Sequence, residues 1–398
     1  MRSKASVRSV PVRDLGDVRV GKQLSPASRS GAGQWPYLRV ANVYEGRIDY
    51  SDVNEMAFSP AERETYALMP GDVLLNEGQE NLMMVGRSAL YCGAPGAYCF
   101  QNTLIRFRPG PDLLPKFAQA VFVWWRANAV FAGVAEKTSI SHLGGNRFGA
   151  LSFPLVPMAA QQRIVDVLDS FSKLEESLEA SIVKLQELGA AVMAELADVD
   201  CSTFEEILAF GPQNGIYKPG SAYGMSGTPI VRIDSFKGGP SDLAGNLLRV
   251  SLTKGEFARY GLATGDVLIN RVNTPELVGK STAVGDLIEP TVFESNMMRC
   301  KLRTNRATPA FVETWLGSPT VKRYFRTRAK SAISQASING DDVRNCPFPK
   351  LEVPEQEAFL RRLSAVRDQQ LTDREELVKL RKLKTGIMDD LLGGRGRA

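Results

Sequence analysis

Two long stretches of the chain place apolar residues three and four positions apart. In residues 158–199 the apolar positions that keep this spacing are Leu168, Phe171, Leu178, Ile182, Leu185, Val192 and Leu196. In residues 353–398 they are Leu363, Val366, Leu377, Leu380, Ile387 and Leu391. This spacing puts side chains on one face of a helix, and polar interruptions such as Glu175 and Lys384 are compatible with a coiled-coil seam. The pattern predicts two long helices, each beginning after a proline-rich step, because proline is tolerated only in the first helical turn.

The remainder of the chain has a different pattern. Residues 1–157 and 200–352 contain short apolar runs interrupted by Gly, Pro and Asn, followed by amphipathic helical patches at Phe117–Phe131 and Phe311–Arg328. Runs of this length, bounded by turn residues, are typical of strands. The sequence therefore predicts four parts: α+β domains at 1–157 and 200–352, a spacer helix at 158–199, and a second helix with a tail at 353–398.

The second half of the chain repeats the first at an offset of about 195 residues. Seven of eleven positions are identical between Tyr66–Asn76 and Tyr260–Asn270, where a Gly-Asp turn leads into an apolar strand. Further matches in the same order are Val85–Ala89 with Val278–Thr282, Phe153-Pro154 with Phe348-Pro349, and Gln161 with Gln356. Similarity that keeps its register over this distance indicates an internal duplication. The predicted fold is two pseudo-symmetric α+β domains separated by two long antiparallel coiled-coil helices.

The two long helices are expected to bury their apolar stripes against each other. Residues 160–198 hold 3 basic and 8 acidic residues, whereas the second helix contains eight Lys and Arg residues between positions 361 and 384, so their charges are complementary. About 40 residues at 1.5 Å each would make a rod of roughly 60 Å, longer than one DNA turn.

Charge and composition narrow the class of protein. The net charge is +5, with 17 basic and 13 acidic residues in 1–158 and 19 and 13 in 202–350. This distribution favours two nucleic-acid-facing domains, although random scatter of surface charge remains an alternative. The five cysteines include no CxxC pair, and His142 is the one histidine, so a zinc ribbon or a pair of histidine metal ligands is not expected. His142 is interpreted as an ordinary loop or interface residue. No apolar run approaches a membrane span, and a cytoplasmic protein is expected.

Several segments together resemble the specificity subunits of type I restriction–modification systems. They are Tyr37–Asp49, Pro70–Asn76, Val85–Ala89, Lys137–Leu143 and Gln161–Val165 in the first half, with Gly211–Pro219, Leu262–Arg271, Ser334–Ile338 and Pro354–Gln356 in the second. The resemblance covers essentially the whole chain. One departure is Pro157-Met-Ala-Ala-Gln161, which lacks the glutamate of the family's Pro-Pro-x-x-Glu-Gln step.

The resemblance implies a function and partners. Each α+β domain would be a target-recognition domain that reads one half of a split sequence in double-stranded DNA. The helices would act as a ruler and as a docking surface for DNA adenine methyltransferase subunits, two being expected, with ATP-dependent restriction subunits in a full complex. The chain itself is expected to bind no cofactor, since S-adenosylmethionine and ATP would bind the partner subunits.

The chemistry visible in the sequence is consistent with a non-catalytic chain. We find no glycine-rich cofactor turn with an Asn/Asp-Pro-Pro-Tyr/Phe element and no Gly-x4-Gly-Lys-Ser/Thr loop for ATP. Two alternatives remain open: a structural adaptor whose domains bind protein, and an enzyme with an unrecognised catalytic site.

Base recognition requires donor and acceptor side chains in loops that differ between the repeats. The candidate DNA-binding residues in the first domain are Gln79, Asn81, Lys137, Thr138 and Ser139. In the second domain they are Tyr217, Lys218, Arg271, Asn273, Lys330, Ser334 and Gln335. Arg39 and Arg232 recur in both repeats and are expected to serve the fold or contact phosphates.

Overall fold

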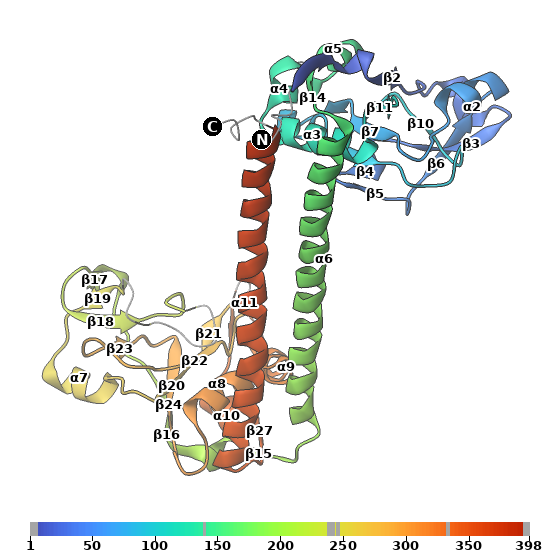
Figure 1. Cartoon of the computed structure of the whole chain (residues 1–398). Helices are drawn as coiled ribbons and strands as arrows, with labels where there is room; N and C mark the ends of the chain where they lie inside the picture. Colours follow the sequence, from blue (N-terminus) through green and yellow to red (C-terminus); the bar gives the residue numbers. More distant parts are fainter. Residues whose placement is uncertain (1–6, 138–140, 237–242, 244–246, 332–334, 393–398) are drawn as a thin grey trace. The chain divides into compact units, whose positions relative to one another are not determined.

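The computed structural model describes residues 7–137, 141–236, 243, 247–331 and 335–392, and the chain divides into two units. Unit 1 consists of residues 1–179 and 375–398, and unit 2 of residues 180–374. Each unit therefore contains one of the predicted α+β domains together with a part of each long helix (Figure 1). None of the described helices is long and apolar enough to cross a membrane.

Each unit is built on an antiparallel four-stranded sheet with the same strand order. In unit 1 the order is β2 (Gly16–Val20), β11 (Leu104–Pro109), β7 (Val73–Asn76), β9 (Ser88–Leu90). In unit 2 it is β16 (Leu208–Asn214), β24 (Met297–Leu302), β20 (Val267–Asn270), β22 (Ser281–Ala283). The predicted internal duplication is therefore present in the strand connectivity as well as in the sequence.

Further sheets also occur in corresponding pairs. In unit 1, β3 (Gln34–Leu38) lies between β6 (Asn54–Ala57) and the parallel strand β10 (Cys99–Phe100). In unit 2, β18 (Thr228–Val231) lies between β19 (Arg249–Val250) and the parallel strand β23 (Val292–Phe293), with β17 (Tyr223–Gly224) beyond β19. Two-stranded sheets pair β1 (Arg8–Pro11) with β14 (Ser152–Leu155), β4 (Val43–Tyr44) with β5 (Arg47–Ile48), and β15 (Cys201–Thr203) with β27 (Pro347–Pro349).

The central strands are buried on both faces, which explains their continuous apolar sequences. Successive side chains of a strand point to opposite faces. Val73 and Leu75 of β7 accordingly pack in one core with the helix at Pro115–Ala127, whereas Leu74 packs in a second core with Leu38 of β3. Strand β20 divides its side chains between two cores in the same way.

Each amphipathic patch forms two helices instead of the single helical segment that the pattern suggested. The pairs are α3 (Pro115–Ala127) with α4 (Val130–Val134), and α8 (Pro309–Leu316) with α9 (Pro319–Arg328). In unit 1 the break coincides with Ala129, whose φ is 58°, and in unit 2 with Gly317 and the N-cap Ser318. The other short helices are α1 (Pro26–Ser30), α2 (Pro60–Tyr66), α5 (Gly145–Ala150), α7 (Lys254–Tyr260) and α10 (Gly340–Arg344).

The two predicted long helices are α6 (Met158–Ala194) and α11 (Val353–Leu392). Helix α6 begins directly after Pro157 and α11 has Pro354 in its first turn, as the proline rule predicts.

The predicted antiparallel coiled coil is present in both units. In unit 1, Lys384 Nζ lies 2.8 Å from Glu175 Oε2, so two polar interruptions of the stripes pair with each other. In unit 2, Ser181 Oγ donates to Asp373 Oδ2 at 2.6 Å. One predicted stripe position is wrong: Leu391 is exposed, and the next residue, Leu392, is buried in its place, because the true seam drifts from the assumed register by the end of the helix.

Candidate nucleic-acid interface

Four of the twelve candidate DNA-binding residues lie in the strands of a small three-stranded sheet, one such sheet in each unit. Three more of the described candidates, Asn81, Arg271 and Gln335, lie within two residues of these strands. In unit 1, β13 (Ser141–His142) lies between β12 (Glu136–Lys137) and β8 (Gly78–Gln79). In unit 2, β26 (Ala336–Ser337) lies between β25 (Lys330–Ser331) and β21 (Val272–Asn273). We call these the small sheets. They join segments that lie about 60 residues apart in the chain, which explains why the sequence showed them only as separate loops.

In the first small sheet, two candidate residues pair with the same residue of the middle strand. Gln79 and Lys137 both pair with Ser141, on opposite sides of β13. Asn81 lies two residues beyond β8, where its Oδ1 accepts a hydrogen bond from Met83 N at 3.0 Å and caps a 3₁₀ turn. Two further candidates, Thr138 and Ser139, lie outside the described residues.

The second small sheet holds candidates at corresponding positions. Asn273 pairs with Ala336, is buried, and accepts a hydrogen bond from Thr274 N at 2.9 Å. Lys330 is exposed on β25, and Gln335 is exposed directly before β26. Ser334 lies outside the described residues.

Equivalent backbone positions in the two units carry side chains of opposite charge. Glu77 donates its N–H to Thr103 O at 3.0 Å and accepts Leu143 N at 2.8 Å. Arg271 donates its N–H to Asn296 O at 2.8 Å and accepts Ile338 N at 3.0 Å. The two residues therefore occupy the same backbone frame beside the small sheets. The repeat alignment contains this signal, since Asn76 and Asn270 immediately precede them, but sequence reasoning selected only Arg271.

The lone histidine belongs to the first small sheet. His142 Nδ1 lies 2.9 Å from Glu77 Oε2, and the side chain remains 44% exposed. The second oxygen of Glu77 accepts Gly144 N at 3.2 Å. Because Glu77 occupies one ring nitrogen of His142, only the other is left to meet a ligand. The sequence interpretation of His142 as an ordinary loop residue did not anticipate this pairing.

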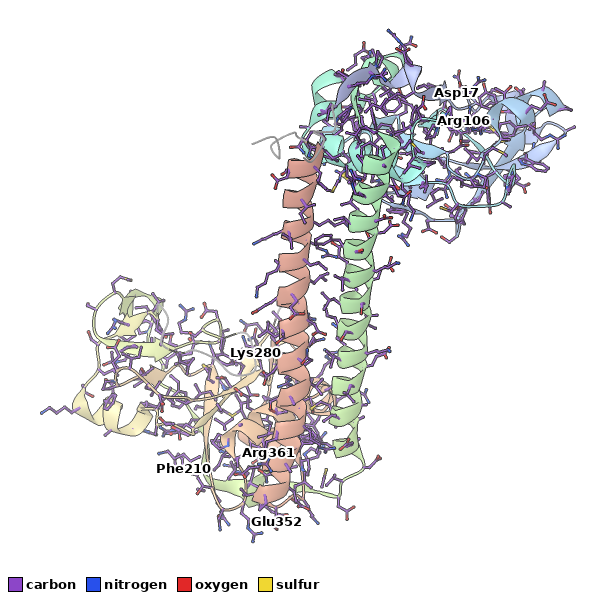
Figure 2. The ribbon with its side chains drawn as sticks, viewed as in Figure 1. Asp17, Arg106, Phe210, Lys280, Glu352 and Arg361 are labelled. Atoms are coloured by element: carbon purple, nitrogen blue, oxygen red, sulfur yellow. The ribbon has the colours of Figure 1, made fainter. Side chains whose placement is uncertain are left out.

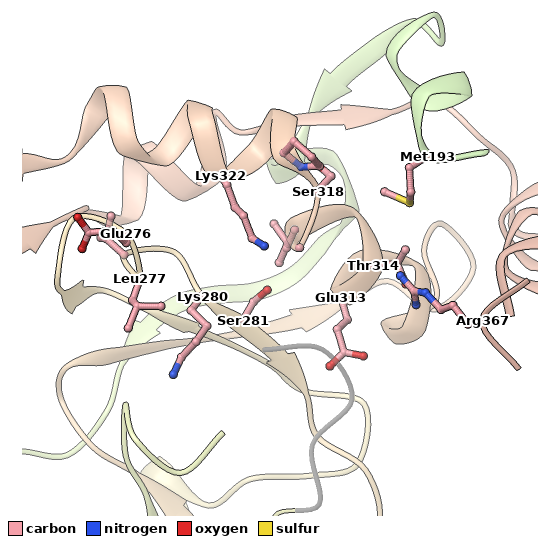
Figure 3. A pocket seen from close by; sticks show the side chains of 14 residues that line it. Met193, Glu276, Leu277, Lys280, Ser281, Glu313, Thr314, Ser318, Lys322 and Arg367 are labelled. Atoms are coloured by element: carbon pink, nitrogen blue, oxygen red, sulfur yellow. The ribbon is translucent and has the colours of Figure 1, made fainter. Parts of the chain in front are cut away.

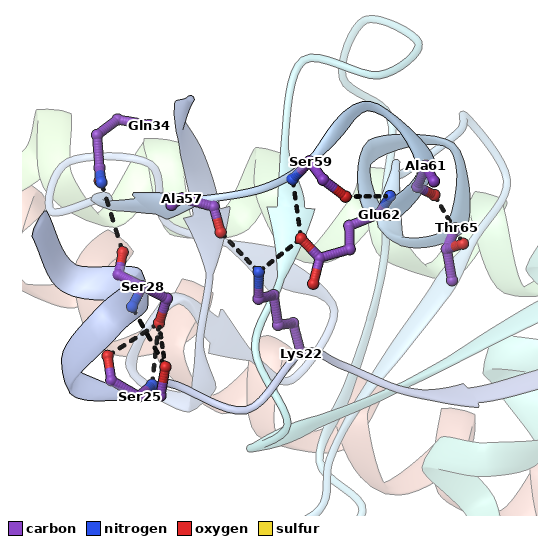
Figure 4. Close-up of polar contacts among 9 residues, drawn as sticks. All are labelled: Lys22, Ser25, Ser28, Gln34, Ala57, Ser59, Ala61, Glu62 and Thr65. Atoms are coloured by element: carbon purple, nitrogen blue, oxygen red, sulfur yellow. Dashed lines mark hydrogen bonds and ion pairs between the residues drawn. The ribbon is translucent and has the colours of Figure 1, made fainter. Parts of the chain in front are cut away.

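Two other candidates lie away from the small sheets. Tyr217 is 78% exposed in the segment after β16. Lys218 forms an ion pair with Glu256, whose carboxylate also caps α7. Figure 4 shows the equivalent arrangement in unit 1, where Lys22 Nζ lies 2.7 Å from Glu62 Oε2 of the α2 capping box. A lysine that makes the same contact in both units supports the fold, which reduces its availability to DNA.

The recurring arginines Arg39 and Arg232 also have carboxylate partners. Arg39 Nη2 lies 2.6 Å from Asp52 Oδ2. Arg232 Nε lies 3.7 Å from Glu294 Oε2, and its guanidinium lies 5.3 Å from the ring centroid of Tyr223. These contacts are compatible with both parts of the prediction, that the two arginines serve the fold or contact phosphates.

Sequence reasoning missed a buried arginine in each unit. Arg106, paired with Asp17 (Figure 2), donates to Thr65 O at 3.2 Å at the end of α2. Arg299 donates to Arg259 O at 3.2 Å at the end of α7. Burial lowers the pKa of both guanidinium groups. Their contacts with the last carbonyls of a helix stabilise its C-terminus and identify both arginines as parts of the scaffold.

Among the described residues, no group of three or more His, Cys, Asp or Glu side chains lies close enough together to hold a metal ion. The arrangement of the small sheets instead offers hydrogen-bond donors and acceptors of differing charge on a common frame.

Comparison with known proteins identifies relatives of one kind. A family model described as the type I restriction modification DNA specificity domain matches residues 6–186. The specificity subunit of the type I restriction enzyme EcoKI from Escherichia coli (strain K12) is 23% identical over 359 residues, covering 82% of this chain and 74% of that protein. The StySPI specificity subunit from Salmonella potsdam is 22% identical over 356 residues, with 82% and 74% coverage.

Solved structures share the fold. The S subunit of a type I restriction–modification system from M. genitalium aligns with a TM-score of 0.53 and 14% identity, covering 98% of this chain and 97% of that one. The HsdS subunit from Thermoanaerobacter tengcongensis aligns with a TM-score of 0.58 and 15% identity, covering 97% and 96%.

Proposed function

This chain belongs to the specificity subunits of type I restriction–modification systems, and from that premise we propose that each unit reads one half of a split sequence in double-stranded DNA. The complete target is asymmetric, because the units share a scaffold but differ in the side chains of their small sheets. The adaptor alternative is not favoured by these relatives.

The main support for the proposal is that Glu77 and Arg271, which make equivalent backbone hydrogen bonds in the two units, have opposite charges. An arginine donates hydrogen bonds to the guanine edge in the major groove, whereas carboxylates accept from the amino group of cytosine. In unit 1 the Glu77 carboxylate is 15% exposed and is engaged by His142 and Gly144, so His142 would present the base-reading atom there. A neutral histidine nitrogen can likewise accept from a base amino group. Beside a common scaffold, Arg271 in unit 2 and His142 with Glu77 in unit 1 would select different bases. Gln79, Asn81, Lys137, Lys330 and Gln335 would supply the neighbouring base and phosphate contacts.

The long helices are proposed as the docking surface for methyltransferase subunits, two in the complete complex. Several of their apolar side chains are exposed: Val167, Leu174, Val378 and Leu383 in unit 1, with Val183, Leu188 and Leu371 in unit 2. Rows of exposed apolar side chains on a helix are typical of interaction surfaces. Restriction subunits would join through the methyltransferase complex.

The chain itself is proposed to carry out no chemical step. The methyltransferase subunits would bind S-adenosylmethionine, and the restriction subunits ATP. In this scheme the chain contributes selection of the site and positioning of its partners.

The proposal is tested by expressing the chain with its methyltransferase in a host without adenine modification and mapping the modified adenines. We expect one split motif with two different halves. Binding of purified complex to that motif should fall steeply with salt, because phosphate contacts release counterions. A complex with no salt-dependent affinity for DNA and no modified motif would refute the proposal.

A further inference from the structure

A tryptophan of unit 1 fills a position between its α+β domain and the long helices. Trp124 of α3 donates its indole N–H to Asp389 Oδ1 of α11 at 2.8 Å. Asn128 Nδ2 lies 3.4 Å from the same oxygen. The indole is therefore held against α11 by a carboxylate.

The corresponding position of unit 2 can be located from contacts that both units share. Gly71 lies against Pro115 and Gly265 against Pro309, so α3 and α8 correspond at an offset of 194 residues. This offset places Ser318 where unit 1 has Trp124. The long helices correspond at an offset of 195, which places Ala194 where unit 1 has Asp389. Both partners of the unit 1 contact are thus replaced by small side chains.

The replacement leaves an open slot in unit 2, with a volume of about 520 Å³. We define the slot by Gly189, Ala190 and Ala194 of α6, Val366 and Arg367 of α11, and Pro319 of α9. Its size lies within the range of about 300–1,000 Å³ that is usual for ligand pockets. A Cβ on Gly189 would lie 3.7 Å from Val366 Cγ1, so the small residues of α6 keep the two helices close while leaving the slot empty.

One guanidinium, that of Arg367, lies at the rim of the slot. Arg367 lines both the slot and an adjoining pocket of about 390 Å³, which Figure 3 shows with Lys322 and Met193. In the described part of α11, the ion pairs use Arg361, Arg362, Arg381 and Lys384 and include none to Arg367. The buried Glu313 carboxyl lines the adjoining pocket and interacts electrostatically with Arg367, without an ion pair between them. A ligand that carries a carboxylate would complement this guanidinium.

The surface beside the slot is apolar and exposed. Val183, which is 52% exposed, lies seven residues before Ala190 and therefore on the same face of α6. Leu371, which is 59% exposed, lies one turn after Arg367 on α11. A small molecule would fill the slot and leave these two side chains in water, whereas a protein would cover all of them.

We propose that the slot receives an aromatic side chain of the methyltransferase subunit, next to a carboxylate that pairs with Arg367. This inference rests on the proposed function, and it adds that the two methyltransferase copies bind the two units through different contacts. In unit 1 the chain's own Trp124 occupies the equivalent position, so the methyltransferase copy that docks on unit 2 is anchored by a contact that the other copy lacks.

The first test is a substitution that fills the slot with a side chain of this chain. Ala190→Trp places an indole on its wall, and Ala191→Trp is the matched control, because Ala191 is also exposed on α6 but does not line the slot. Loss of a buried aromatic anchor typically weakens an interface by roughly tenfold or more. We expect Ala190→Trp to weaken binding of one methyltransferase copy by that factor and to shift native mass spectra toward complexes with one copy. Ala191→Trp should remain close to the parent.

A second pair of variants tests the charge. Arg367→Glu should weaken binding of the same methyltransferase copy. Arg374→Glu should leave that binding unchanged, because Arg374 is exposed on α11 and does not line the slot. Equal behaviour of both tryptophan variants, with circular dichroism unchanged, would overturn the inference while leaving the proposed function intact. A parent chain that binds no methyltransferase at all would instead refute the proposed function, and this inference with it.

Discussion

Gln161 and Gln356 make the same three hydrogen bonds in the two units. Gln161 accepts Leu114 N at 2.8 Å and donates to Asp112 O and Val156 O, both at 2.9 Å. Gln356 accepts Thr308 N at 3.0 Å and donates to Arg306 O at 2.8 Å and Leu351 O at 2.9 Å. Both side chains are fully buried. Each glutamine therefore joins the first turn of a long helix to the loop that begins α3 or α8.

Replacing Gln161 by leucine should destabilise unit 1. The substitution removes the partner of three part-buried backbone groups, and leaving a buried group unpaired costs about 1–3 kcal/mol. We expect a loss of about 3 kcal/mol in the free energy of unfolding, measured by urea denaturation and assigned to unit 1 by hydrogen exchange. Gln162→Leu is the control, since Gln162 is exposed and bonds only to Asp166 in the next turn. If both variants lose the same stability, the glutamine contact is not the cause.

Gly86 should not tolerate alanine. Its φ is +76°, and a Cβ would lie 2.2 Å from Cδ2 of Phe131, a contact repeated by Gly279 and Phe325 at 2.4 Å. Overpacking of a core costs about 1–3 kcal/mol, in addition to about 1 kcal/mol for the left-handed backbone. Gly46→Ala isolates the backbone cost, because φ there is +71° with nothing within 4 Å of the new Cβ. Thermal denaturation should show a clearly larger decrease in Tm for Gly86→Ala, and equal decreases would contradict the packing argument.

Glu313 should make the stability of unit 2 depend on pH. Burial raises the pKa of Glu313 above its ordinary value of 4.5. The folded state therefore holds this proton more tightly than the unfolded state. The stabilisation is complete below pH 4.5 and is lost as the pH rises through the folded pKa, where the buried carboxyl becomes charged.

Glu313→Gln should consequently be more stable than the parent at pH 7, and this advantage should vanish below pH 4.5. Unit 1 already carries Gln119 at this position, and a glutamine oxygen can still accept the bond from Ala283 N, which is 2.8 Å long. Urea denaturation across this pH range measures the difference. Glu276→Gln should instead be less stable than the parent at pH 7, because hydrogen bonds from its own amide and Thr274 favour the charged carboxylate and lower the pKa of Glu276. A gain for Glu313→Gln that does not change with pH would argue against the buried charge.

Arg271→Ala should reduce the base preference at one position of the split DNA motif and leave the other half of the motif unchanged. A bidentate arginine contact contributes about 1–3 kcal/mol of discrimination between bases. Mapping modified adenines in a host that expresses the variant measures this directly. Lys330→Ala should instead weaken binding to all sequences and reduce the slope of affinity with salt by about one, as expected for a phosphate contact. Relaxation in both halves at once would show that Arg271 acts through the scaffold.

The long helices, the central apolar strands and the duplication could be predicted from the amino-acid sequence alone. The spacing of Leu168, Leu178 and Leu185 is a local property of a helix, and the Gly-Asp turn before Val73 and Val267 is a local property of the chain. Prolines at 157 and 354 set the beginnings of the long helices for steric reasons that need no partner. Matching register at Gln161 and Gln356 was enough to indicate that both halves fold alike.

The pairing of polar side chains could be known only from the folded chain. The partner of Lys218 lies 38 residues away and that of His142 lies 65 residues away, and no periodicity connects them. Trp124 and Asp389, separated by 265 residues, interact because α3 packs against α11. Pairings of this kind depend on burial and distance in the folded chain, since a carboxylate or an indole binds whichever group the packing of apolar faces brings within reach.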